Sequence, residues 1–185
     1  GKLRFEFDKV FNVDSGQEDI FNTIANDKVI DTLNGFNCTI FAYGQTGSGK
    51  THTMLGPVAS LFNPQETFNL GLIPRILNSI FSEIEIITSN NETPEKRESN
   101  IMSLGPTDIV NSSIIKCSSL ELYQEHMIDL LNNNSENLLI REDVKRGMYV
   151  EGIMEKQIED PRSALEIVLL GLKNRHVAAT KMNSE

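Results

Sequence analysis

Apolar and polar positions alternate at the start of the chain. The residues concerned are Leu3, Arg4, Phe5, Glu6 and Phe7. An alternation with a period of two residues predicts a half-buried β-strand. A second run, residues 38–42, is mostly apolar and rich in β-forming side chains, and it predicts a short buried strand.

Apolar residues recur at helical spacing in three other stretches. A first helix is predicted over residues 16–33, opened by a capping box of Ser15 and Glu18. A second helix is predicted from Leu72 onward, with a proline in its first turn and an apolar stripe along one face. The last helix is predicted to begin at Asp160, which is a typical capping residue and is followed by proline.

The region between the second and last helices is richer in strand patterns. Residues 113–123 contain β-branched and aromatic side chains and predict a central strand. Residues 125–131 predict a short helical turn. Two further runs, 138–141 and 148–153, predict the strands of a β-hairpin.

Three segments lack a consistent period. Residues 56–70 contain two prolines and predict an inserted surface loop. Residues 88–112 are rich in Ser, Asn, Glu and Lys and predict a polar, mobile linker. Residues 141–150 are expected to contain the loop of the hairpin.

The run from 38 to 42 leads directly into a glycine-rich sequence. Gly44 is followed by four residues and then by Gly49, Lys50 and Thr51, which is the pattern of a phosphate-binding loop. Glycines let the backbone curl around a polyphosphate, so that successive N–H groups face its oxygens. The predicted phosphate-binding residues are Gly44, Gln45, Thr46, Gly47, Ser48, Gly49, Lys50 and Thr51.

Lys50 and Thr51 have distinct predicted roles in such a loop. The lysine ammonium reaches the β- and γ-phosphates, and the threonine hydroxyl binds the Mg²⁺ ion that bridges them. The alternative for Thr51 is an ordinary helix-capping threonine. Strands alternating with helices, one strand running into a phosphate loop, predict an α/β fold of the P-loop NTPase type. In that fold a mixed central sheet has helices on both faces.

Charge and composition narrow the partners and the compartment. The 185 residues carry a formal net charge of −9, which argues against a nucleic-acid partner because such proteins normally present a basic face. The two cysteines, Cys38 and Cys117, lie far apart in sequence and predict buried thiols in a reducing compartment. No apolar run approaches the ~20 residues of a membrane span, so we expect no membrane partner.

Several stretches together resemble the kinesin motor domain. Residues 5–11 read F-E-F-D-K-V-F, similar to that family's F-x-F-D-x-V-F, and residues 34–54 are similar to its N-G-x-N-x-T-I-F-A-Y-G approach and phosphate loop. Residues 121–131 resemble its E-I-Y-N-E…D-L-L segment, 141–152 its strand-loop-strand, and 174–183 its helix leading into switch I. The resemblance covers almost the whole chain in family order.

The resemblance implies further nucleotide contacts. His52 follows the loop where kinesins often carry a side chain that stacks on adenine; the alternative is a solvated helix histidine. Asn183 matches the first residue of switch I and would approach the γ-phosphate; the alternative is a loop-capping asparagine. The implied cofactors are ATP or ADP and Mg²⁺.

The resemblance also implies a microtubule-facing surface. Arg141, Lys145 and Arg146 occupy the loop that in kinesins faces β-tubulin, with Arg146 the best positional match. The alternative is a solvated charged hairpin, since Glu142 and Asp143 lie beside these cations.

The implied function is an ATP-driven microtubule motor in the cytoplasm, on cytoskeletal microtubules such as those of a spindle or an axoneme. Residues 1–185 correspond to a partial motor domain that stops at the start of switch I. The full domain would be a microtubule-stimulated ATPase, whereas this chain alone is expected to be inactive, and dimerisation is expected through a stalk outside it. One alternative is a kinesin-fold microtubule-binding protein that does not cycle ATP. An unrelated GTPase lacks support, because no N-K-x-D motif is present.

Overall fold

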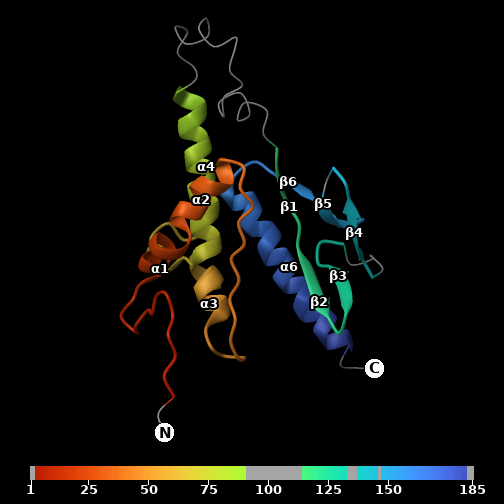
Figure 1. The fold of residues 1–185 in the computed structure, drawn as a ribbon, viewed down its shortest axis with the longest axis horizontal. Helices are drawn as coiled ribbons and strands as arrows, with labels where there is room; N and C mark the ends of the chain where they lie inside the picture. The colour runs from red at the N-terminus through yellow and green to blue at the C-terminus, as the bar shows by residue number, and fades with distance from the viewer. Residues whose placement is uncertain (1–2, 91–113, 133–136, 146, 183–185) are drawn as a thin grey trace, which may run out of the picture. The chain divides into compact units, whose positions relative to one another are not determined.

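The computed structural model describes residues 3–90, 114–132, 137–145 and 147–182, without the side chains of residues 90 and 176–182. The chain divides into two compact units, Gly1–Thr107 and Asp108–Glu185. Each unit is described separately below, with the element labels of Figure 1.

The N-terminal unit is helical in its described part. It contains α1 (Gln17–Ile24), α2 (Asn26–Leu33), α3 (Lys50–Leu55) and α4 (Leu72–Asn90). Helix α4 is in contact with the other three helices (Figure 1). The buried apolar side chains of this unit come from α2 to α4, from the break between α1 and α2, and from the segment before α4: Ala25, Val29, Leu55, Leu61, Leu70, Leu72 and Pro74.

The first predicted helix forms as two. It breaks at Ala25, although backbone hydrogen bonds continue across the break, from Ala25 N–H to Phe21 O (2.8 Å) and from Val29 N–H to Ala25 O (3.1 Å). The predicted capping box is wrong by one residue. Gly16 is the N-cap, and its N–H donates to Asp19 Oδ2 (2.9 Å), because the Ser15 hydroxyl is engaged with Asn12 in the preceding turn.

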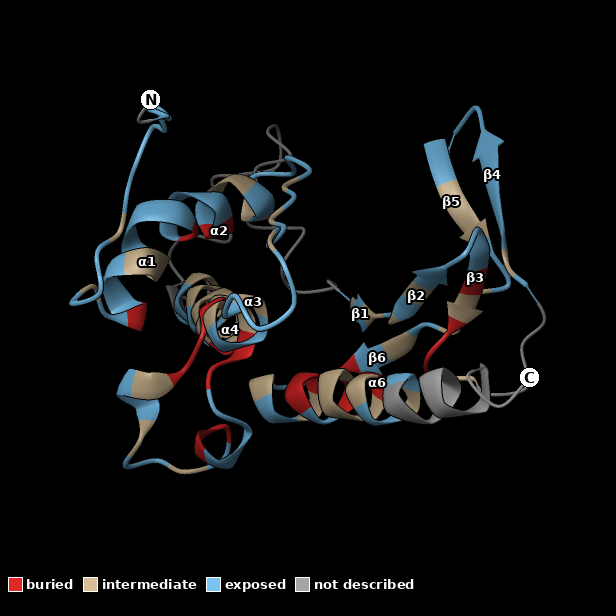
Figure 2. Cartoon of the chain, turned by 90° about the horizontal axis from the view of Figure 1, so that it is seen from below, coloured by how far each residue is buried: buried red, intermediate tan, exposed pale blue. Residues whose placement is uncertain are grey.

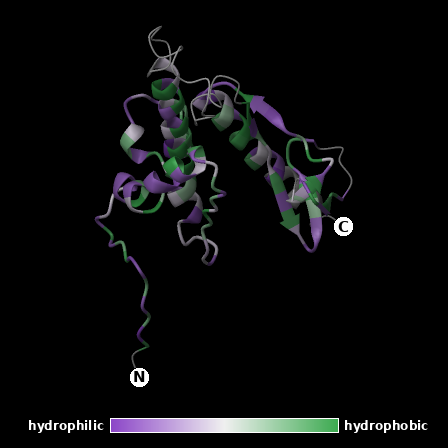
Figure 3. Ribbon diagram, turned by 45° about the horizontal axis from the view of Figure 1, so that its top comes forward, coloured by the Kyte–Doolittle hydropathy of each residue, from purple (hydrophilic) through white to green (hydrophobic). Residues whose placement is uncertain are grey.

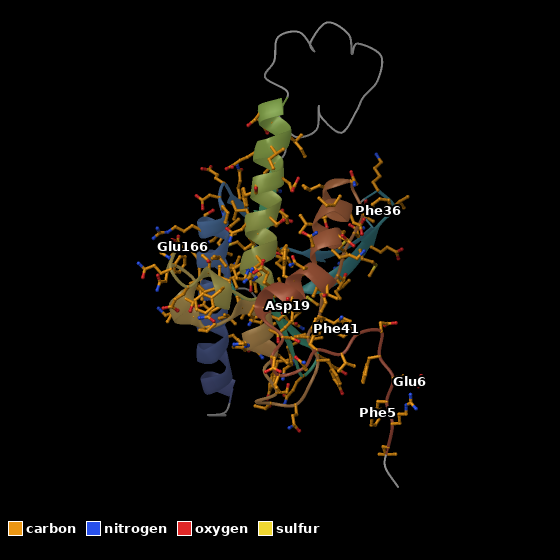
Figure 4. All side chains as sticks on the ribbon, turned by 90° about the vertical axis from the view of Figure 1, so that its left-hand side faces the viewer. Phe5, Glu6, Asp19, Phe36, Phe41 and Glu166 are labelled. Carbon is orange, nitrogen blue, oxygen red and sulfur yellow. The ribbon has the colours of Figure 1, made fainter. Side chains whose placement is uncertain are left out.

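The two strands predicted in this unit do not form. Residues 3–7, next to the N-terminus in Figure 3, and residues 38–42, between α2 and α3 in Figure 1, are extended but unpaired. Their aromatic side chains are exposed, with Phe5 at 73% and Phe41 at 82% (Figure 4). A strand needs a neighbouring strand to accept and donate its backbone hydrogen bonds. The described part of this unit contains none.

The segment between α3 and α4 is ordered by short-range contacts. It contains two 3-10 turns, Val58–Ser60 and Thr67–Asn69. The Ser60 hydroxyl is buried and donates to Glu66 Oε2 (2.5 Å). The predicted linker 88–112 lies mostly outside the described residues, and only its first residues are visible, as the end of α4.

The C-terminal unit contains all the described strands. They are β1 (Ile115–Cys117), β2 (Leu120–Tyr123), β3 (His126–Asp129), β4 (Leu139–Asp143), β5 (Gly147–Glu151) and β6 (Lys156–Ile158). They pair as three two-stranded antiparallel sheets, β1–β6, β2–β3 and β4–β5, rather than as one central sheet. The pairing registers include Ile115 with Ile158, Leu120 with Asp129, and Leu139 with Glu151.

Two predictions in this unit are wrong in detail. The single strand expected over 113–123 is divided into β1 and β2 at Ser118 and Ser119. The helical turn expected over 125–131 is instead strand β3. It follows a two-residue turn in which Gln124 and Glu125 both have positive φ (47° and 66°), the backbone that a tight hairpin requires.

Helix α6 (Pro161–Met182) lies along the small sheets (Figure 2). The predicted cap is confirmed, because Asp160 Oδ1 accepts the N–H of Ser163 (2.7 Å). The side of α6 that faces the strands is buried at Ala164, Leu165 and Ile167. Farther along, Asn174 donates to the backbone oxygen of Leu130 (2.6 Å), so the helix is also fixed to the loop after β3.

Candidate functional site

The glycine-rich loop is compact. Gly44, Gly47 and Gly49 all have positive φ, at 154°, 80° and 92°. The Ser48 N–H donates to Gln45 O (3.2 Å), which closes a four-residue turn with Gly47 in its third position. A positive φ at that position favours glycine strongly. The pattern predicted from sequence is therefore present as a curled backbone.

Lys50 begins α3 immediately after this loop. Its Nζ donates to the backbone oxygens of Gly44 (2.8 Å) and Gln45 (2.7 Å). The ammonium group is thereby held over the loop by carbonyl oxygens, which are replaceable acceptors. An anion in the loop would meet the ammonium and the glycine backbone together.

Thr51 and His52 follow in the first turn of α3, and both are exposed. Two hydrogen bonds fix His52. The side-chain Nε2 of Gln17 donates to its backbone oxygen (2.8 Å) and lies 3.1 Å from its ring Nδ1. A buried glutamine from α1 therefore orients His52, the residue for which the family resemblance predicts stacking on adenine.

Sequence reasoning missed Gln17. Its side chain is only 9% exposed, and its Oε1 has no hydrogen-bond partner among the residues that the structure describes. No local pattern marks it, because its partner is far away in the chain.

The three cations predicted to face a microtubule differ in their surroundings. Arg141 donates to Glu151 Oε2 (2.9 Å), and this hydrogen bond and the charge of Glu151 raise the pKa of the guanidinium. Lys145 lies in the turn of the β4–β5 hairpin, where its backbone N–H donates to Asp143 Oδ1 (2.9 Å). Arg146 lies outside the described residues, as does Asn183.

Comparison with known proteins decides the family. Residues 1–185 match the sequence profile of the kinesin motor domain over their whole length. The chain belongs to the kinesin motor-domain family. The resemblance inferred from the motifs is thereby confirmed.

Similar kinesins come from animals and plants. The chain is 41% identical over 182 residues to kinesin-like protein KIF15-A of Xenopus laevis, covering 98% of this chain and 12% of that protein. Human KIF15 is 40% identical over 182 residues, with 98% and 12% covered. Kinesin-like protein KIN-12E of rice, Oryza sativa subsp. japonica, is 40% identical over 181 residues, with 98% and 9% covered. The chain therefore spans a small part of each of these kinesins.

A solved kinesin confirms the predicted fold class. It is a fast kinesin described for its ATPase mechanism and its interactions with microtubules. It matches with a TM-score of 0.73 and 35% sequence identity, covering 97% of this chain and 44% of that chain. The helices and small sheets of this kinesin chain thus belong to the α/β kinesin motor fold.

Two further observations concern metals and membranes. Within the described residues, no group of three or more His, Cys, Asp or Glu side chains could hold a metal ion. None of the helices in the described part of the chain is both long and apolar enough to span a bilayer.

Proposed function

We propose that this chain is the phosphate-binding part of an ATP-driven microtubule motor. The observation that supports it most directly is the position of Lys50, whose ammonium lies against the curled glycine loop. In nucleotide binding, Lys50 exchanges these carbonyl oxygens for β- and γ-phosphate oxygens. The exchange is favourable because a charge-assisted hydrogen bond is stronger than one to a neutral carbonyl.

The other loop residues complete the nucleotide site. The backbone from Gln45 to Thr51 donates N–H groups to the phosphates, and the Thr51 hydroxyl is a ligand for Mg²⁺. The ion bridges phosphate oxygens and neutralises charge that develops on them during transfer. His52 lies against the adenine, and Asn183 approaches the γ-phosphate.

Microtubule contact is proposed through the β4–β5 hairpin. Lys145 and Arg146 are the main cations, and Arg141 contributes less because it is paired with Glu151. Hydrolysis coupled to cyclic microtubule binding then gives movement on cytoplasmic microtubules, including those of a spindle or an axoneme. The motor dimerises through a stalk beyond these residues and uses neither a nucleic acid nor a membrane as partner.

Nucleotide titration of the 185-residue chain tests this proposal. We expect a fluorescent ATP analogue with Mg²⁺ to bind, and Lys50→Ala to bind it about 10- to 100-fold more weakly, because hydrogen bonds to charged groups contribute roughly 1.5–3 kcal/mol. Lys28→Ala is the matched control. That lysine is exposed and paired with Asp31, so its removal should leave affinity unchanged.

Phosphate release tests the catalytic part. The chain alone should show no microtubule-stimulated release, whereas a complete motor domain containing it should. Equal ATP affinity of Lys50→Ala and wild type would contradict the proposed site. A complete domain that binds microtubules but hydrolyses no ATP would favour a non-cycling binder instead.

A further inference from the structure

The contact between Gln17 and His52 joins two residues that no motif connects. Gln17 is the first residue of α1, and His52 lies in the first turn of α3. The amide nitrogen of Gln17 carries two protons. One is donated to the backbone oxygen of His52 (2.8 Å), and the other faces the ring nitrogen Nδ1 (3.1 Å).

This geometry selects one form of the imidazole ring. The backbone oxygen of His52 can only accept, so the group facing it must be the NH₂ end of the Gln17 amide. The same NH₂ group faces Nδ1, which must then be an acceptor. The ring proton is therefore on Nε2, on the side away from Gln17.

The amide oxygen of Gln17, Oε1, indicates that this residue does more than fill space. Its Oε1 is buried and has no partner within the described part of the chain. Burying an unpaired acceptor is unfavourable, and an apolar side chain of similar size would avoid that loss. Gln17 is only 9% exposed, and the side-chain hydrogen bonds that its amide makes among the described residues are both with His52.

We propose that Gln17 is a positioning residue for His52. It holds the imidazole as the Nε2–H tautomer in one orientation, and so determines how the ring meets a purine base bound beside the phosphate loop. The effect on a bound purine base rests on the proposed nucleotide site. The tautomer itself is a property of the protein without nucleotide.

Long-range ¹H–¹⁵N NMR of the 185-residue chain tests the tautomer directly. The His52 signals are identified by their loss in His52→Gln. Wild type should show the pattern of a ring protonated on Nε2. Gln17→Leu should show a mixture of the two tautomers, and Gln17→Glu should move the proton to Nδ1, because a carboxylate can only accept.

Comparing MgATP with tripolyphosphate, which has no base, distinguishes an effect on base binding from an effect on phosphate binding. Gln17→Leu should bind MgATP about 2- to 10-fold more weakly, the range expected for the loss of one ordinary hydrogen bond. It should bind inorganic tripolyphosphate as wild type does. Lys50→Ala should weaken both ligands. Gln65→Leu, at an exposed glutamine outside the site, is the matched control and should change neither.

Stability measurements separate positioning from a structural role. Gln17→Leu should unfold at the same or a higher urea concentration than wild type, since it removes the unpaired oxygen. An unchanged His52 tautomer in Gln17→Leu and Gln17→Glu, or an equal loss of ATP and tripolyphosphate affinity in Gln17→Leu, would overturn the inference. If wild type bound neither ligand, the proposed nucleotide site would be wrong, while the NMR result would still decide the role of Gln17.

Discussion

Both units of the chain contain buried apolar side chains, but the C-terminal unit also joins its segments through a fully buried carboxylate. In the N-terminal unit, helices meet through apolar side chains and through a close backbone approach, where Gly71 N–H donates to Leu55 O (3.0 Å). In the C-terminal unit, single polar side chains join segments. Asp129 is fully buried and accepts the N–H groups of Leu131 (2.8 Å) and Met154 (2.7 Å).

This difference explains why one unit tolerates missing strands. Helices satisfy their own backbone hydrogen bonds, so α1 to α4 form although residues 38–42 remain unpaired. Two-stranded sheets are marginally stable alone. The C-terminal unit therefore depends on specific ties between its sheets and α6.

Removing the carboxylate of Asp129 should have the largest effect. Asp129→Ala leaves two N–H groups without their acceptor, and each unpaired buried donor costs about 1–3 kcal/mol. We expect the free energy of unfolding to fall by about 3 kcal/mol in urea titrations. Asp143→Ala is the matched control. Its carboxylate also accepts a backbone N–H but is exposed, so its loss should cost less than about 0.5 kcal/mol.

An equal fall in the free energy of unfolding of Asp129→Ala and Asp143→Ala would contradict the idea that the buried carboxylate stabilises the C-terminal unit. Asp129→Asn sharpens the test. The amide retains one acceptor oxygen and places its NH₂ group against the second N–H. The free energy of unfolding should therefore fall by an amount between those of Asp129→Ala and Asp143→Ala.

A methyl group added at one closely packed glycine of each unit, Gly71 and Gly171, should have a smaller effect than the loss of Asp129. At Gly71 a Cβ would lie 2.6 Å from Leu55 N and 2.7 Å from Gly56 N. Backbone atoms cannot rotate away, so Gly71→Ala should cost about 1–3 kcal/mol through overpacking. At Gly171 in α6 the Ser119 hydroxyl lies at 2.5 Å and can rotate away, whereas the Ser119 Cβ, at 3.1 Å, needs to shift by only a few tenths of an ångström.

Gly171→Ala should accordingly be close to neutral. The better helix propensity of alanine, worth about 1 kcal/mol, offsets the displacement of Ser119. Urea unfolding of both variants measures the difference. A larger loss at Gly171 than at Gly71 would show that the polar ties of the C-terminal unit leave its strands less room to adjust than the backbone contact between α3 and α4.

The smallest expected effect concerns the thiol of Cys117 in β1. Burial raises the pKa of this thiol, because it disfavours the thiolate. In a Cys38→Ser background, the alkylation rate of Cys117 should rise with pH around a higher midpoint in the folded chain than in urea. Coincident midpoints would mean that the thin β1–β6 sheet does not exclude water from its inner face.

The sequence predicts the local features of this chain well. The turn at Gly47, the helix that starts at Leu72 and the cap at Asp160 each depend on residues within a few positions of one another. Backbone preference and capping decide such features. The curled glycine-rich loop belongs to this class, which is why a turn there could be predicted from the sequence.

The features that the sequence misses depend on distant partners or on unusual turn residues. The β2–β3 hairpin turns at Gln124 and Glu125, whereas Asn and Gly are the usual residues at positive φ. The pairing of Gln17 with His52 produces no repeating pattern in the sequence, and neither do the two hydrogen bonds that Asp129 accepts. Residues 3–7 and 38–42 have the side chains that favour strands, but no strand pairs with them in the described part of their unit, so the predicted strands do not form.

The tight turn at Gln124 and Glu125 has a consequence for the order of folding. Only these two residues separate β2 from β3, whereas residues 118–155 separate β1 from β6. Closing a short loop loses less chain entropy, and hairpins form within about 1–10 μs. The β2–β3 hairpin can therefore act as an early nucleus, on which the slower pairing of β1 with β6 is completed.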